Sequence, residues 1–191
     1  MRPSELRMSL ALTEEDGQVL IETARQAITS RLSQKAGCYP APVTPALMIP
    51  CGAFVTLKSN GSLRGCIGRI SSNRSLLQTV KEVAVSSAFE DPRFPPLTKS
   101  EWPSVRIEVS VLTPFKRVRD PQSVCVGTHG VMIRRGYSSG LLLPQVATEQ
   151  GWNREELLTH ACRKAGLPPE AWKDPATQIE VFSAMVFEQA E

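Results

Sequence analysis

The sequence predicts an α+β fold with a mainly antiparallel sheet flanked by helices, and two observations lead to this class. Three segments carry apolar residues at helical spacing, whereas the others alternate apolar and polar residues as half-buried strands do. The strands are separated by hairpin turns and not by the regular helical crossovers that a parallel sheet requires. With 191 residues, the chain has room for one compact domain or two small subdomains.

The three helices are marked by capping signals at both ends. We expect them over residues 13–37, 72–91 and 153–166. Side-chain oxygens suited to an N-cap are found at Thr13, at Ser72 or Asn73, and at Asn153. Residues that end a helix follow at Gly37, Pro92 and Gly166.

The strands are expected over residues 53–58, 62–67, 105–111, 124–126, 131–135 and 179–187. Between the first two, the Asn-Gly pair at 60–61 is a strong signal for a type I′ hairpin turn. A two-residue turn would pair Leu57 with Arg64 and Val55 with Cys66. Strand alternation would then put Arg64 and Cys66 on one face of the sheet, about 7 Å apart.

Composition limits the class of protein and the kinds of site. The five cysteines are odd in number, widely spaced and without a CxxC pair, which indicates free thiols and no structural zinc site. Only two histidines are present, which excludes a His-rich metal site. The N-terminus lacks the apolar core of a signal peptide, and no apolar run approaches the ~20 residues of a membrane span. We therefore expect a cytoplasmic protein with no membrane, and neither a metal site nor an organic cofactor follows from the residues.

Positive charge is unevenly distributed, although the net charge is only +3. No Asp or Glu occurs in residues 23–81, which include Arg64, or in residues 121–148, which include Arg134. A local positive field favours anionic ligands such as phosphate, carboxylate, nucleotide or RNA. The alternative is a solvated basic face whose counter-charges come from the rest of the chain.

The most informative stretch is residues 63–68, Leu-Arg-Gly-Cys-Ile-Gly, on the return strand of the hairpin. A guanidinium at Arg64 would favour the thiolate form of Cys66, and Gly65 and Gly68 would let a ligand or another backbone approach. The alternative is a small buried cysteine packed on the neighbouring strand, with Arg64 paired at the strand edge.

Other candidate site residues lie on loops and strand ends. His129, flanked by glycines, suits a general acid or base, although a lone histidine is more often structural. Catalysis by a Cys/His pair would require Cys66 and His129. Glu108 could orient Arg64 or His129, or be a solvated cross-strand partner. Gln145 would supply an amide at the end of a strand.

Residues 63–68 are identical to the signature hexapeptide of the AMMECR domain family, named after the Alport syndrome, midface hypoplasia and elliptocytosis chromosomal region. Further blocks are similar to those of the family and occur in the same order: 53–58, 91–97, 107–114, 129–130, 140–146 and 164–167. The resemblance covers roughly residues 12–188 as a single AMMECR-like domain, with residues 1–11 as an N-terminal extension.

The resemblance implies an α+β fold of two intertwined subdomains. In microbes it implies a place in the AmmeMemoRadiSam system, beside a Memo-type protein and a radical SAM protein. It supplies no catalytic mechanism, so three alternatives are open. The first is an enzyme component in which Cys66 is nucleophile or acid, Arg64 its electrostatic partner and His129 the base. The second is a non-catalytic module whose arginines, Arg64 and Arg134 among them, hold an anionic small molecule or RNA. The third is an adaptor for the other proteins of the system.

Overall fold

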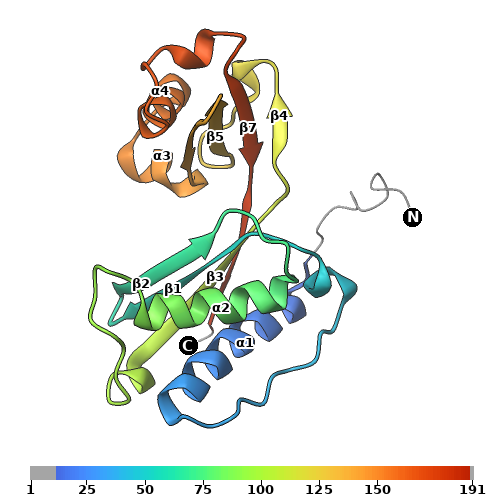
Figure 1. Ribbon diagram of the computed structural model, residues 1–191, viewed down its shortest axis with the longest axis vertical. Helices are drawn as coiled ribbons and strands as arrows, with labels where there is room; N and C mark the ends of the chain where they lie inside the picture. The colour runs from blue at the N-terminus through green and yellow to red at the C-terminus, as the bar shows by residue number, and fades with distance from the viewer. Residues whose placement is uncertain (1–11, 190–191) are drawn as a thin grey trace. The chain divides into compact units, whose positions relative to one another are not determined.

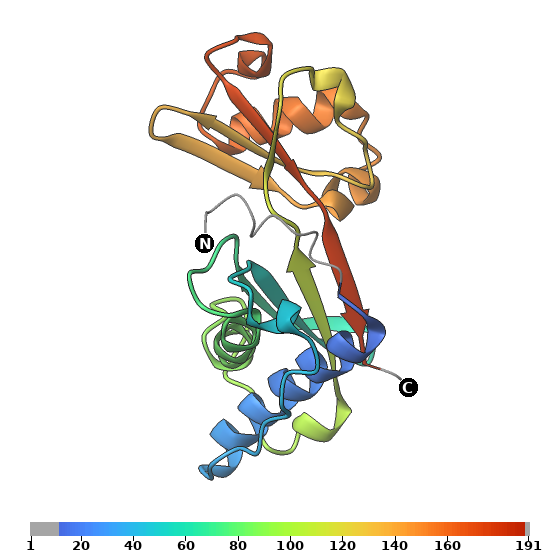
Figure 2. The ribbon, with the colours of Figure 1, turned by 90° about the vertical axis from the view of Figure 1, so that its right-hand side faces the viewer.

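The computed structural model describes residues 12–189, which form an α+β fold with two four-stranded sheets (Figures 1 and 2). The described chain divides into two compact units. The first unit contains the residues up to Val111 and those from Met185 onward, and the second contains Leu112–Ala184. The predicted fold class is confirmed.

The first unit combines two helices with one sheet. Its helices are α1 (Glu14–Ser33) and α2 (Leu76–Phe89). Its strands are β1 (Ala53–Ser59), β2 (Ser62–Arg69), β3 (Val105–Leu112) and β8 (Ala184–Glu188), in the order β2-β1-β3-β8. Two short 3₁₀ helices, η1 (Pro45–Met48) and η2 (Trp102–Ser104), lie in the connections.

Both helix starts depend on side-chain caps, and one cap was predicted correctly. Thr13 caps α1 and forms a reciprocal capping box with Asp16. The cap of α2 is Ser75, whose side chain accepts from the Gln78 N–H, and not Ser72 or Asn73, which lie before or within a bend at residues 73–74. The Ser72 hydroxyl accepts from the Arg74 N–H in that bend. The predicted end of α1 at Gly37 is also wrong. The helix ends at Ser33, where Gln34 takes up the left-handed conformation (φ 59°) that terminates a helix.

The core of the first unit lies between its helices and one face of its sheet. Alternate residues of the central strands, among them Val55, Leu57 and Ile107, are fully or almost fully buried. They belong to one cluster with Leu20 of α1 and Val80 of α2. The two helices pack against each other, as Figure 1 shows. The intervening residues of these strands point to the opposite face of the sheet.

The second unit repeats this plan with a smaller sheet. Its strands are β4 (Lys116–Val118), β5 (Gly130–Arg135), β6 (Ser138–Leu142) and β7 (Gln178–Phe182), in the order β4-β7-β5-β6. Its helices are α3 (Pro144–Gln150) and α4 (Arg154–Lys164), with the 3₁₀ helices η3 (Pro121–Ser123) and η4 (Ala171–Lys173). The predicted Asn153 cap of α4 is confirmed as a capping box with Glu156.

Two predicted strands differ from the structure. Residues 124–126 form no strand; they follow η3 and enter a tight turn. The single strand expected over 179–187 is two strands, β7 and β8, which belong to different sheets. The break lies at Ser183, whose N–H donates to the Thr113 side chain and whose carbonyl accepts from the Thr113 N–H.

All five cysteines are free thiols, as predicted. Between residues 12 and 189, no helix is both long enough and apolar enough to cross a lipid bilayer. Within that same range, no three His, Cys, Asp or Glu side chains are grouped as a metal ion would need.

Candidate functional site

The signature hexapeptide lies on β2, an edge strand, directly after the predicted hairpin turn. Asn60 and Gly61 have φ angles of 50° and 77°, as a type I′ turn requires. The register changes after the first two pairs, so that Leu57 pairs with Gly65 and Thr56 with Cys66. Arg64 is therefore the extra residue of a β-bulge. The predicted pairs of Leu57 with Arg64 and Val55 with Cys66 are wrong by one residue for this reason.

The bulge gives Cys66 different neighbours from those predicted. Its register partner Thr56 is in turn the partner of Glu108 on β3, so the three residues form a row across three strands. The Cys66 Sγ lies 3.3 Å from the Thr56 Oγ1. Glu108 accepts a hydrogen bond of 2.7 Å from Lys58. Because Leu57 points into the core, this row lies on the face opposite the helices, and Cys66 is not packed on Val55 and Leu57.

The backbone of Cys66 is held from outside the sheet by two charged side chains, which we call the Asp91–Arg93 clamp. The Cys66 N–H donates to the Asp91 carboxylate at 2.8 Å, and the Cys66 carbonyl accepts from Arg93 at 3.1 Å. Arg93 also donates to both oxygens of Asp91, at 2.9 and 2.7 Å. The clamp thus satisfies edge groups that another strand would otherwise pair.

The two charged side chains of the clamp shift each other's pKa values in opposite directions. The side chain of Asp91 is almost completely buried. Hydrogen bonds from Arg93, with further ones from the backbone N–H groups of Cys66 and Arg93, hold the pKa of the Asp91 carboxyl far below its usual range despite this burial. In return, the Asp91 carboxylate raises the pKa of Arg93. The pair is therefore ionised over the whole neutral range.

The two glycines of the hexapeptide are explained by close packing. A Cβ at position 65 would lie 2.2 Å from the backbone oxygen of Ser87 in α2, and one at position 68 would lie 2.2 Å from the Phe54 ring. The Ser87 hydroxyl also accepts from the Ile67 N–H at 2.9 Å and donates to the Val55 carbonyl at 2.8 Å. The glycines therefore let α2 and a β1 side chain approach the strand closely.

Arg64 is directed to the loop that follows α2. Its guanidinium donates to both oxygens of Glu101, at 2.9 and 3.3 Å, and to the Pro95 carbonyl at 3.0 Å. Hydrogen bonds from Arg64 and then from Thr98 lower the pKa of Glu101 to about 2. The Arg64 Nη1 is buried and has no hydrogen-bond partner within the described part of the chain. The hydrogen bonds of Arg64 thus secure the loop and do not involve the Cys66 thiol.

The remaining predicted site residues lie in the second unit. His129 closes a turn, since its Nδ1 accepts from the Cys125 N–H at 3.1 Å and its own N–H donates to the Cys125 carbonyl at 2.8 Å. Arg134 donates to Glu180 across the sheet at 2.8 Å. Gln145 is exposed in the first turn of α3. The structure brings Cys66 and Glu108 into one row, whereas it assigns these three residues to the other unit.

Four residues of the site were not identified from the sequence: Thr56, Asp91, Arg93 and Glu101. The sequence indicates Asp91 only as part of a helix stop and, with Arg93, of the family block 91–97, without a role in the site. The available signal was an acid and an arginine two positions apart, directly after a helix and before a proline-rich loop. Such a pair can form a local ion pair, but nothing in the sequence shows that it reaches the backbone of Cys66.

One protein family matches this sequence along most of its length. The sequence model of the AMMECR1 family matches residues 21–187, which include all the site residues of the first unit. The chain belongs to the AMMECR1 family.

Its relatives in this family include archaeal proteins of similar length. Protein MK0488 of Methanopyrus kandleri is 46% identical over 193 residues, covering 96% of this chain and 93% of that protein. Protein NEQ441 of Nanoarchaeum equitans is 42% identical over 177 residues, covering 89% and 98%. The crystal structure of the uncharacterized protein PH0010 from Pyrococcus horikoshii has a TM-score of 0.81 at 39% identity, with 93% of each chain covered. The AMMECR1 fold is therefore shared along almost the whole chain.

Proposed function

We propose that this chain is the AMMECR component of a cytoplasmic AmmeMemoRadiSam system and acts there as a non-catalytic binding module for a Memo-type or a radical SAM protein. Membership of the AMMECR1 family supports the first part. One observation supports a binding role over a chemical one. The charged side chains near Cys66 are bonded to one another or to the Cys66 backbone, and none of them bonds to the thiol. We treat residues 12–188 as one functional domain.

The surroundings of Cys66 argue against a nucleophilic thiolate. A reactive cysteine needs a base or an unpaired cation beside it. The closest cationic candidates are already neutralised, because Arg64 is bonded to Glu101 and Arg93 to Asp91. The hydrogen-bond contact of the Cys66 Sγ is the Thr56 hydroxyl, which is not a base at neutral pH.

The surface that we propose for the partner is the helix-free face of the first unit. We define it by the residues Thr56, Lys58, Leu63, Cys66, Glu108 and Val186. Leu63, the register partner of Lys58, is 44% exposed, and Val186 is 51% exposed beside the buried Phe187. A rigid sheet with a polar centre and exposed apolar side chains at its edges resembles the mixed composition of non-obligate protein interfaces.

The test is co-expression with the Memo-type and the radical SAM protein of the same genome, followed by affinity purification and titration calorimetry. We expect a complex with at least one of them at a Kd of about 1 μM or below. Leu63→Glu should weaken it about tenfold or more. Val43→Glu is the matched control, because Val43 is 45% exposed in the loop between α1 and β1, beside Thr44, which donates to Asp16 of α1. Binding by neither protein, or an equal effect of both variants, would show the proposal to be wrong.

A chemical role for Cys66 is the second candidate, and a different observation favours it. The Asp91–Arg93 clamp and the packed glycines fix the backbone on both sides of the thiol, as a catalytic group requires. Cys66→Ser separates the two roles. Both roles predict that this variant still forms the complex. The binding role predicts that the reaction of the complex continues, whereas a chemical role predicts that it stops.

A further inference from the structure

Strand β4 is an open edge of the sheet in the second unit. The strand order is β4-β7-β5-β6, so β4 has a neighbour on one side only, and Figure 1 shows no helix or strand of that unit beyond it. Residues 116–118 pair with β7. In the described part of the chain, the backbone groups of residues 116–119 have no hydrogen-bond partner other than β7. The outer side of β4 is therefore free to pair with another extended chain.

Three cations along this edge are without acidic partners. Lys116, Arg117 and Arg119 are exposed, and none of them forms a salt bridge with another residue of the described chain. Glu180, the register partner of Arg117, is bonded to Arg134 instead, at 2.8 Å. Cations on an edge strand discourage pairing with a second copy of the same strand, but they attract a strand that carries acids.

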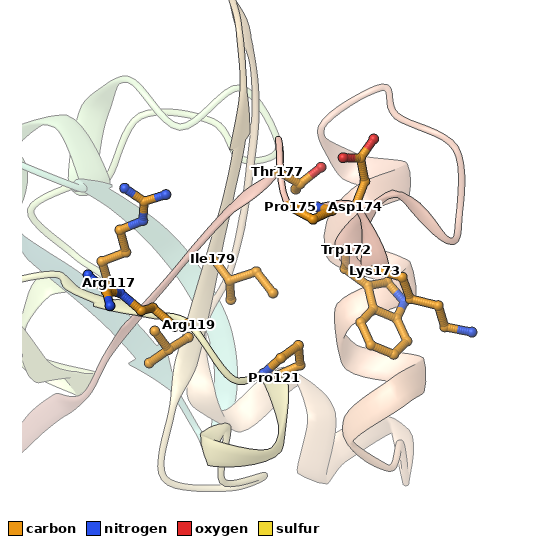
Figure 3. Close-up of a pocket in the computed structure, with 10 residues that line it drawn as sticks. Arg117, Arg119, Pro121, Trp172, Lys173, Asp174, Pro175, Thr177 and Ile179 are labelled. Carbon is orange, nitrogen blue, oxygen red and sulfur yellow. The ribbon is translucent and has the colours of Figure 1, made fainter.

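The two faces of the sheet differ in chemistry at this edge. Arg117 and Arg119 extend from the face opposite Ile179, as Figure 3 shows. On the other face, Val118 and its register partner Ile179 line a hollow of about 330 Å³ between β4 and η4. The indole of Trp172 forms part of its wall. A strand added beside β4 would therefore direct alternate side chains to the two arginines on one face and to the hollow on the other.

We infer that β4 binds an extended acidic segment of a partner protein, which adds a fifth strand to the sheet of the second unit. The backbone of the segment pairs with the outer side of β4, its carboxylates on one face are held by Arg117 and Arg119, and a small apolar side chain on the other face enters the hollow. In this mode of recognition the backbone bonds supply affinity and the alternate side chains supply specificity. The inference concerns the second unit alone and does not depend on the partner proposed for the first unit.

An acidic peptide fits this edge better than a nucleic acid does. The free edge of a strand offers N–H and C=O groups at the spacing of another peptide backbone. Single-stranded nucleic acids bind where bases can stack on exposed aromatic rings. The aromatic residue next to β4, Phe115, instead packs edge to face on the buried Phe182. The exposed Tyr137 lies in the turn between β5 and β6, at the other edge of the sheet.

The test is a titration of the ¹⁵N-labelled protein with a synthetic peptide, followed by NMR. The peptide has capped ends and the sequence Gly-Glu-Val-Glu-Val-Glu-Gly, in which acids and valines alternate. We expect saturable shifts of the amide signals of residues 116–119 and of the Trp172 indole signal, with a Kd of about 100 μM or below. A peptide with lysine in place of each glutamate should bind about tenfold more weakly or worse, and an oligouridylate of similar length should also bind more weakly than the acidic peptide.

Methylation of the peptide backbone separates strand addition from simple charge attraction. In an added strand, the N–H groups of alternate residues point to β4 and the others point away. One acidic peptide is therefore methylated on the glutamate nitrogens and a second on the valine nitrogens. We expect one of the two to lose binding and the other to keep it, because only one set of N–H groups donates to β4.

Variants decide whether the edge is the one described. Arg117→Gln with Arg119→Gln should weaken binding of the acidic peptide about tenfold or more. Arg163→Gln with Lys164→Gln removes the same charge from exposed positions of α4 and should leave binding unchanged. The inference is overturned if millimolar peptide leaves the signals of residues 116–119 or of the Trp172 indole unshifted, or if both methylated peptides bind alike. It is also overturned if the double arginine variant binds as the original chain does, or if the oligouridylate binds more tightly than the peptide.

Discussion

The Asp91 carboxylate lies 2.8 Å from the backbone nitrogen of Cys66 and accepts its N–H at the outer edge of β2. A side chain thus takes the place of a neighbouring strand at the centre of the signature hexapeptide. Arg93 completes the arrangement by donating to the Cys66 carbonyl and to Asp91 itself. The ion pair ties the loop after α2 to the strand that follows the hairpin, so the stability of this strand depends on the charge of Asp91.

Asp91→Asn should therefore destabilise the protein in a pH-dependent way. The pKa of Asp91 in the folded chain lies below its unfolded value of about 3.9, so the ionised form stabilises the fold at neutral pH, and this contribution is lost as the pH falls below about 4. We expect the variant to lose about 1.5–3 kcal/mol of unfolding free energy at pH 7. Urea denaturation between about pH 7 and 2 should show a flatter acid dependence than in the original chain. Glu22→Gln, an exposed change on α1, is the control, and equal acid dependence in both variants would contradict this account.

Gly65→Ala should be far more damaging than Gly61→Ala. The new methyl group at position 65 would lie 2.2 Å from the Ser87 backbone oxygen, so α2 or β2 would have to move, at a cost of about 3 kcal/mol or more. At position 61 the methyl group meets nothing within 4 Å, and only the positive φ of 77° is strained, which costs about 1 kcal/mol. Thermal unfolding of the two variants measures this difference. Similar losses would mean that backbone conformation and not packing requires the glycine of the hexapeptide.

Gly61 is required by a local turn, whereas Gly65 is required by a contact with a distant residue. This difference explains how much of the site could be predicted from the sequence. The turn at 60–61 was predicted because Asn-Gly is itself suited to two positive φ angles, a local property. The bulge at Arg64 was not, since it accompanies the packing of Ser87 on Gly65, a contact between distant residues. Apolar periodicity alone cannot place an extra residue in a strand, and one such residue changes every later pair.

The same limit applies to the longer elements. The fold class, the Thr13 and Asn153 caps and the strand at 105–111 follow from local pattern, and the structure confirms them. The separation of β7 from β8 does not, because apolar alternation continues through Ser183 without a visible break. That break is decided by hydrogen bonds with Thr113, which is remote in the sequence. The role of Asp91 likewise depends on a backbone group 25 positions earlier.

Cysteine alkylation should divide the five thiols by exposure and not single out one residue. Cys38 and Cys125 are exposed and should react first at about pH 8, with Cys66 slower. Cys162 and Cys51 should be almost inert, because they are buried and burial raises both pKa values, that of Cys51 to about 11. Peptide mass spectrometry after timed labelling measures each rate. If Cys66 instead reacts much faster than Cys38 and Cys125, the chemical role becomes the better proposal.

We expect the hydrogen-bond geometry of Arg64 and Glu101, and not their charge alone, to hold the loop after α2 in place. Arg64 is only 11% exposed and donates two hydrogen bonds to Glu101, which is 40% exposed. Solvent therefore screens one partner, and a double-mutant cycle of Arg64→Met with Glu101→Gln should give a coupling of about 1 kcal/mol, below the range of a fully buried pair.

The matched variant for this cycle is Arg64→Lys, which keeps the charge and removes the planar fork. It should lose most of the coupling, since a lysine cannot make both bonds to Glu101 and also reach the Pro95 carbonyl. Urea denaturation of the set gives each free energy. If Arg64→Lys is as stable as the original chain, the contribution of Arg64 is electrostatic. In that case its hydrogen bonds do not determine the position of the loop that brings Asp91 and Arg93 to the backbone of Cys66.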